Sequence, residues 1–260
     1  MDEQELLNQI QEAYQHIAGK DLTGIYVHGS IAFGCFHWER SDIDFLVVVE
    51  NPLTQHQKEQ MIQVLLELDP FAPAKGFEMS VLLRSACLPL TEPIPFELHY
   101  SNAHRANYQR DLSGTCRMMH GFDPDLPAHI AVAQNVGITL CGKPIRSVFA
   151  PVPCESYLRS IWYDIENTPT DIEAAPVYCI LNLCRALAFV QDGLILSKEQ
   201  GGHWGLRHLP HDAAVIRAAL DAYQAGAAFP SSIQLRSFAE KMLIRICQNA
   251  EFLSDCNKNN

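Results

Sequence analysis

The chain of 260 residues is 48% hydrophobic and 19% charged, which is enough apolar material to bury a core without disulfides or a structural metal. Its formal net charge of −11 disfavours nucleic acid and anionic membranes as partners and favours cationic small molecules. No apolar run approaches the roughly 18 residues of a membrane helix, and the N-terminal segment MDEQELLNQIQEAYQ lacks the pattern of a signal peptide. Because the nine cysteines include no C-x-x-C pair, we expect reduced thiols and a cytoplasmic protein.

The first part of the chain alternates helical patterns with short apolar runs. Spacing of apolar residues predicts helices at Glu3–Ile17, Thr54–Leu68 and Pro127–Asn135. Strands are predicted at Leu22–His28, Ile43–Val49, Phe77–Leu83, Phe96–Tyr100 and Gly137–Cys141. Together these elements predict a mixed β-sheet covered by helices.

The second part of the chain is helical almost throughout. Two prolines in the segment FAPVP interrupt the pattern, so we place a domain boundary there, between residues 1–150 and 151–260. Helices are expected at Glu155–Glu166, Pro176–Gln191, Ser197–Arg207, Asp212–Ala225 and Ser232–Leu253. The predicted fold class is therefore α+β, a mixed-sheet domain followed by an all-helical bundle domain.

The most informative segment pairs Gly29-Ser30 with the sequence SDID, which begins at Ser41 and leads into the strand FLVVV. Side chains two apart on a strand share a face, so Asp42 and Asp44 present two carboxylates in one direction. Such a pair suits Mg²⁺, which also takes phosphate oxygens. Gly29 lets a phosphate approach the backbone, and the Ser30 hydroxyl can donate to a phosphate oxygen. The two motifs together predict a Mg²⁺–nucleotide site.

Other readings of these residues are structural. Asp42 could cap a turn and Asp44 could be solvated at a strand end, although aspartate suits the interior of an apolar strand poorly. Glu97 and His99 alternate in PFELHYS, so they border the site or serve the fold, and the sequence favours neither. The chain contains no P-loop, dinucleotide-binding or esterase motif.

The segment HGSIAFGCFHWERSDIDFLVVV resembles the signature of the DNA polymerase β-type nucleotidyltransferases. The later segment LNLCRALAFVQDGLILSKEQGGHWGLRHLP is similar to the helical domain of the aminoglycoside (3'') adenylyltransferases. The resemblance implies an N-terminal nucleotidyltransferase domain and a helical domain that clamps substrate and nucleotide. It also implies an antibiotic-resistance enzyme.

The resemblance assigns roles to individual residues. Gly29, Ser30 and Ser41 would bind the nucleotide, Asp42 and Asp44 would hold Mg²⁺, and Glu78 would be the catalytic base. A carboxylate inside the apolar strand FEMSVLL agrees with that role, the alternative being a surface-facing residue on an edge strand. The family's basic residues that reach the nucleotide match Arg185 and Lys198, each of which could also be an ordinary solvated helix charge.

One stretch departs from the family pattern. Where acids that meet the cationic antibiotic are expected, this chain has Ala175 and Pro176. Asp171 and Glu173 lie nearby and are candidates to replace them. The departure leaves the fold and chemistry intact and leaves the choice of antibiotic open.

The implied reaction is Mg²⁺-dependent transfer of AMP from ATP to a hydroxyl of an aminoglycoside of the spectinomycin or streptomycin class, releasing pyrophosphate. A cationic acceptor also agrees with the acidic charge of the chain. Two alternatives remain. One is a nucleotidyltransferase with another acceptor, such as a different antibiotic, a metabolite or a protein hydroxyl, and the other is a non-catalytic nucleotide-binding module.

Overall fold

The computed structural model describes residues 1–226, 229–230 and 235–257. The chain forms two compact units, Met1–Val152 and Pro153–Asn260. Among the described residues, no helix combines the length and the apolar character needed to cross a lipid bilayer.

The first unit is built around a five-stranded mixed sheet of order β5-β3-β2-β1-β7. Its strands are β1 (Leu22–Val27), β2 (Ile43–Val49), β3 (Phe77–Leu83), β5 (Leu98–Tyr100) and β7 (Ile138–Gly142), and a separate pair joins β4 (Pro95–Phe96) to β6 (Gly121–Phe122). The strands β2 and β3 are parallel, and every other pair is antiparallel. Every residue of β2 is buried, as expected for a central strand covered on both faces.

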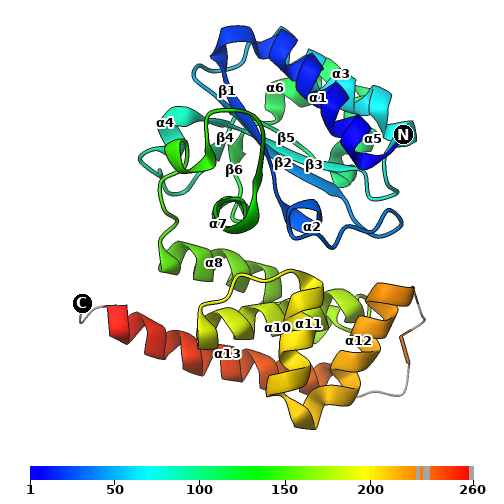
Figure 1. The fold of residues 1–260 in the computed structure, drawn as a ribbon, viewed down its shortest axis with the longest axis vertical. Coiled ribbons are helices and arrows are strands. Elements are labelled where there is room, and N and C mark those ends of the chain that lie inside the picture. Colours follow the sequence, from blue (N-terminus) through cyan, green and yellow to red (C-terminus); the bar gives the residue numbers. More distant parts are fainter. Residues whose placement is uncertain (227–228, 231–234, 258–260) are drawn as a thin grey trace. The chain divides into compact units, whose positions relative to one another are not determined.

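Helices cover both faces of this sheet (Figure 1). One face packs with residues of α1, α3, α5 and α6, and the other packs with α7. The helices and single turns of the unit are α1 (Glu3–Ala18), η1 (Gly19–Asp21), α2 (Gly29–Ala32), α3 (Gln55–Leu68), η2 (Asp69–Phe71), α4 (Arg84–Cys87), α5 (Asn102–Arg110), α6 (Leu112–Met118), α7 (Leu126–Val136) and η3 (Ile145–Ser147). The predicted mixed sheet covered by helices is confirmed.

The predicted strand Phe96–Tyr100 is wrong as a single element. Phe96 ends β4 in the two-stranded sheet, whereas Leu98–Tyr100 forms β5 at the edge of the main sheet. Glu97 lies between them, and its Oε2 is 4.0 Å from Nζ of Lys58 on α3. The chain changes partner at Glu97, so Glu97 and His99 do not lie together on one strand.

The second unit is a helical bundle around α10 (Pro176–Asp192), which contacts α8, α9, α11, α12 and α13. Most of α10 is buried, as expected for a helix that is apolar on nearly all sides. The surrounding elements are α8 (Cys154–Ile165), α9 (Thr168–Asp171), α11 (Lys198–His208), η4 (Pro210–Asp212), α12 (Ala213–Ala225) and α13 (Leu235–Asn257). The helix expected from Ser232 corresponds to α13, and residues 232–234 lie outside the described residues. The predicted helical bundle is confirmed.

Candidate active site

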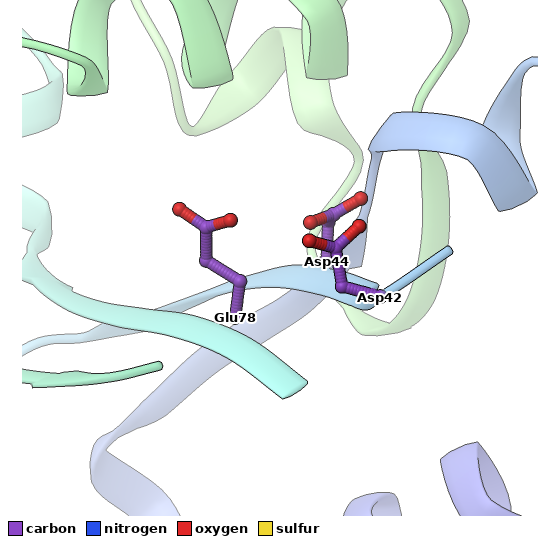
Figure 2. A group of neighbouring side chains, drawn as sticks. All are labelled: Asp42, Asp44 and Glu78. Carbon is purple, nitrogen blue, oxygen red and sulfur yellow. The ribbon is translucent and has the colours of Figure 1, made fainter. Parts of the chain in front are cut away.

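Three carboxylates converge at one end of the sheet in the first unit. One oxygen from each of Asp42, Asp44 and Glu78 lies within 4.8 Å of the others, and we call these residues the acidic triad. Figure 2 shows all three side chains projecting to the same side, Glu78 from one strand and the two aspartates from the neighbouring chain segment. The parallel register explains the convergence, because Asp44 on β2 pairs directly with Glu78 on β3.

The members of the acidic triad differ in exposure. Asp44 is buried at 9% relative exposure, whereas one third of the Glu78 side chain is exposed. Three carboxylates this close repel one another unless a cation lies among them, and hard oxygen ligands fit Mg²⁺. A buried Asp44 suits a metal ligand, and a partly exposed Glu78 suits a group that a second substrate must reach.

Gly29 and Ser30 begin α2, directly beside the acidic triad. Gly29 has φ +59°, and a Cβ at this position would lie 1.8 Å from Oδ2 of Asp44. Any side chain there would therefore displace Asp44. The Ser30 Oγ is buried and has no hydrogen-bond partner among the described residues. A buried hydroxyl without a partner is costly, so this atom suits a ligand such as a phosphate oxygen.

Ser41 has a local partner within the loop before β2. Its Oγ accepts a hydrogen bond of 3.1 Å from the backbone amide of His37, and its own amide donates to the His37 carbonyl at 2.8 Å. These bonds close the turn that leads into Asp42. Binding of a nucleotide by Ser41 stays a prediction.

A group of histidines near the acidic triad was not predicted as part of the site. His129 on α7 has Nε2 3.7 Å from Oε1 of Glu78. Its ring lies 4.9 Å from the ring of His28, which is buried at the end of β1. His28 is the first residue of the HGS segment but was given no role, and no motif marks His129, whose proximity to Glu78 depends on how α7 packs on the sheet.

Burial keeps His28 and His99 neutral. It lowers the pKa of His28 well below its usual value, and nearby His129 lowers it further. Burial also lowers the pKa of His99 to about 4, with Asp123 opposing the shift and His104 adding to it. The Nδ1 of His99 lies 2.9 Å from the Oγ of Ser80. His99 is therefore a neutral hydrogen-bonding partner of Ser80.

In the second unit, Arg185 is held by its neighbours on both sides. Its Nε donates to the Leu196 carbonyl at 2.8 Å, and its Nη1 donates to Oδ1 of Asn182 at 2.9 Å. The amide of Asn182 in turn donates to Asp164 at 2.8 Å. Lys198, the first residue of α11, places Nζ 5.1 Å from the centre of the Tyr178 ring. Both cations thus have contacts within this unit.

A buried serine hydroxyl without a partner among the described residues, beside clustered carboxylates on a mixed sheet, is the arrangement expected of a nucleotidyltransferase. The protein-family model described as "Nucleotidyltransferase domain" matches residues 5–82 of the chain. The family model described as "Aminoglycoside adenylyltransferase, C-terminal domain" matches residues 147–245. Together the two models match more than half of the chain. The chain belongs to the aminoglycoside adenylyltransferase family and is an adenylyltransferase enzyme.

Curated relatives and a solved structure agree with this membership. The chain is 26% identical over 202 residues to a spectinomycin 9-adenylyltransferase of Staphylococcus aureus, covering 76% of each protein. It is 22% identical over 204 residues to the spectinomycin 9-adenylyltransferase of Enterococcus faecalis, covering 76% of this chain and 78% of that protein. A crystal structure of an enterococcal spectinomycin adenyltransferase with ATP and spectinomycin has a TM-score of 0.79 at 19% identity, covering 94% of this chain and 99% of that chain.

Proposed function

We propose that this enzyme transfers AMP from ATP to a hydroxyl of spectinomycin, with Mg²⁺ as cofactor and pyrophosphate as the second product, in the cytoplasm. The acidic triad beside the unpartnered Ser30 hydroxyl is the observation that carries the proposal. The named relatives support ATP as donor and spectinomycin as acceptor. Such a reaction would confer resistance to the antibiotic.

The residues present fit both Mg²⁺ and a triphosphate. Asp42 and Asp44 would hold the cation, which would supply positive charge against the phosphate groups of ATP. Ser30 would donate its hydroxyl to a phosphate oxygen, and Gly29 keeps the space that Asp44 occupies. Ser41 shapes the turn before Asp42 and is proposed as a further nucleotide-binding residue.

Glu78 would act as general base. It accepts the proton of the acceptor hydroxyl while the hydroxyl oxygen forms a bond to the α-phosphorus and the bond from that phosphorus to pyrophosphate breaks. Its exposure allows a second substrate to reach it, whereas the more buried Asp44 is shielded for metal binding. The protein forms no covalent bond to the nucleotide in this scheme, so positioning and charge carry the rate.

Arg185 and Lys198 are proposed to neutralise the phosphates of ATP. The Nε and one Nη1 donor of Arg185 are used within the second unit, and no partner for Nη2 is found among the described residues. A guanidinium fixed in this way loses little freedom when it binds an anion. The family resemblance of the surrounding segment supports the same role.

The acceptor is the part of the proposal with a second candidate. Ala175 and Pro176 stand where acids are expected in the family, and the exposed Asp171 and Glu173 lie just before them. This difference favours testing streptomycin and other aminoglycosides beside spectinomycin.

The experiment is a product assay on the purified chain with Mg²⁺ and ATP. Each antibiotic is incubated separately. The mass of the antibiotic product is measured by mass spectrometry, and the pyrophosphate released is measured in the same reaction. We expect spectinomycin to gain one adenylyl group with one pyrophosphate released for each product formed. If only another aminoglycoside is adenylylated, that antibiotic takes the place of spectinomycin as the proposed acceptor. The absence of transfer to every antibiotic would refute the proposed activity.

A further inference from the structure

The Glu78 carboxylate needs a partner to hold one orientation. It ends a side chain with several rotatable bonds, and one third of that side chain is exposed. Proton transfer requires the accepting oxygen to lie within hydrogen-bond reach of the hydroxyl, and small misplacements are costly. His129 is the group that the structure places against this carboxylate, with 3.7 Å between Nε2 and Oε1.

His129 is well placed to provide that support, because its own position is fixed. It lies on α7, whose residues Leu126, Ile130 and Ala133 pack into the core against the sheet. The buried ring of His28 lies against the ring of His129 at an angle of 38°. Four-fifths of the His129 side chain is shielded from solvent. A rigid helix on one side and a buried ring on the other therefore restrict its rotamers.

His28 connects His129 to Asp44, another member of the acidic triad. Its backbone amide donates to the carbonyl of Asp44 at 3.0 Å. Its neutral ring can pack against His129 without charge repulsion. A continuous set of contacts thus runs from Asp44 through His28 and His129 to Glu78.

We propose that His129 is the positioning residue for Glu78, with His28 holding the His129 ring in place. The contact of 3.7 Å between Nε2 of His129 and Oε1 of Glu78 orients the carboxylate, which leaves Oε2 for the proton of the acceptor hydroxyl. His129 neither touches the acceptor nor receives its proton. The inference rests on the proposed function, in which Glu78 is the general base.

Two variants of equal polarity and different reach test the inference. The side-chain amide of His129→Gln reaches as far from the backbone as Nε2, whereas the amide of His129→Asn reaches only as far as Nδ1. We expect His129→Asn to lower kcat about 10- to 100-fold, the usual effect of losing a supporting contact, with the KM for ATP nearly unchanged. His129→Gln should recover kcat to within about threefold of the parent enzyme.

A double-mutant cycle with Glu78→Gln asks whether His129 acts through Glu78. In the Glu78→Gln background, His129→Asn should change kcat less than about twofold, because there is no longer a base to position. The control is His203→Asn on α11, where Nε2 lies 3.9 Å from Oε1 of Glu199 in a similar pair. This control should leave kcat and KM at parent values.

Three kinetic results would overturn the inference. The first is full activity of His129→Asn. The second is an equal loss of kcat in His129→Gln and His129→Asn. The third is a loss of kcat on His129→Asn that is the same in the parent enzyme and in the Glu78→Gln background. A readout that needs no activity is the ¹⁵N resonance of Nε2 in His129. This resonance should shift in Glu78→Gln and should stay at its parent position in His203→Asn. Inactivity of the parent enzyme with every acceptor would refute the proposed function, and an unmoved resonance would refute the inference.

Discussion

Gly29 shows how the conformation of one residue sets the position of a carboxylate of the acidic triad. Its φ of +59° is unfavourable for other residues, and its missing Cβ leaves the space that Asp44 occupies. The sequence suggested that glycine is needed for close approach of a phosphate. The structure adds that glycine is also needed for Asp44, which no local pattern could reveal because the contact joins β2 to the start of α2.

Gly29→Ala should therefore abolish Mg²⁺–ATP binding, because the new methyl group displaces Asp44. Gly193→Ala is the matched control, since Gly193 has φ +68° and open space around its missing Cβ. Both variants should lose about 1–2 kcal/mol of stability from backbone strain. Thermal unfolding and calorimetric titration with Mg²⁺–ATP check both quantities. Normal ATP affinity in Gly29→Ala would show that Asp44 has no role in binding.

The start of α11 is an element whose boundary matters for function. Ser197 and Gln200 form a capping box. The backbone amide of Gln200 donates to Ser197 Oγ at 3.1 Å, and the backbone amide of Ser197 donates to Gln200 Oε1 at 3.0 Å. Helix α3 begins in the same way, with Thr54 and Gln57. The capping box of Ser197 and Gln200 orders the turn that carries Lys198, a proposed nucleotide contact.

Replacing Ser197 by Ala should cost about 1 kcal/mol of stability through loss of the cap. It should also weaken ATP binding severalfold, because a charge-assisted phosphate contact contributes about 1.5–3 kcal/mol and Lys198 would be less well ordered. Thr54→Ala removes the equivalent cap in the other unit and should lower stability by a similar amount with ATP affinity unchanged. Calorimetry and thermal unfolding on both variants provide the comparison. Equal ATP affinity in the two would remove Lys198 from the nucleotide site.

Elements with strong apolar periodicity were predictable, and polar elements were not. The expected helices Ser197–Arg207 and Thr54–Leu68 correspond to α11 and α3, because a capping residue marks the start of each and apolar spacing continues along it. Helix α5, with the sequence NAHRANYQR, was missed because Tyr108 is its only residue buried in the structure. Polar helices of this kind are stabilised by packing of neighbouring segments, which the sequence does not display.

At the scale of the whole molecule, strand alternation predicted that Asp42 and Asp44 share a direction. The direct pairing of Asp44 with Glu78 additionally required the parallel register of β2 and β3. His129 comes from α7, far along the chain, so only the packed fold brings it to Glu78. Residues next to one another on a strand can thus be found from sequence, and supporting residues from other elements cannot.

The net charge of −11 leads to a prediction about the whole molecule. An acidic protein attracts a cationic acceptor, and salt screens that attraction as the Debye length falls from about 10 Å at 0.1 M to about 3 Å at 1 M. The KM for spectinomycin should therefore rise at least roughly threefold between low and high salt at saturating Mg²⁺. The KM for the anionic ATP should not rise in parallel. Steady-state kinetics in a salt series checks this, and parallel rises would point to a general effect on the enzyme.

The central claim, that the acidic triad catalyses adenylyl transfer with Glu78 as base, is tested most directly on Glu78→Gln. The glutamine keeps the size of the side chain and cannot accept the hydroxyl proton. The measurement pairs single-turnover rates with Mg²⁺–ATP affinity. The account predicts a rate lower by roughly 10²–10⁴-fold with ATP affinity little changed. A parallel fall in affinity would make Glu78 a metal ligand instead, and an unchanged rate would contradict the account.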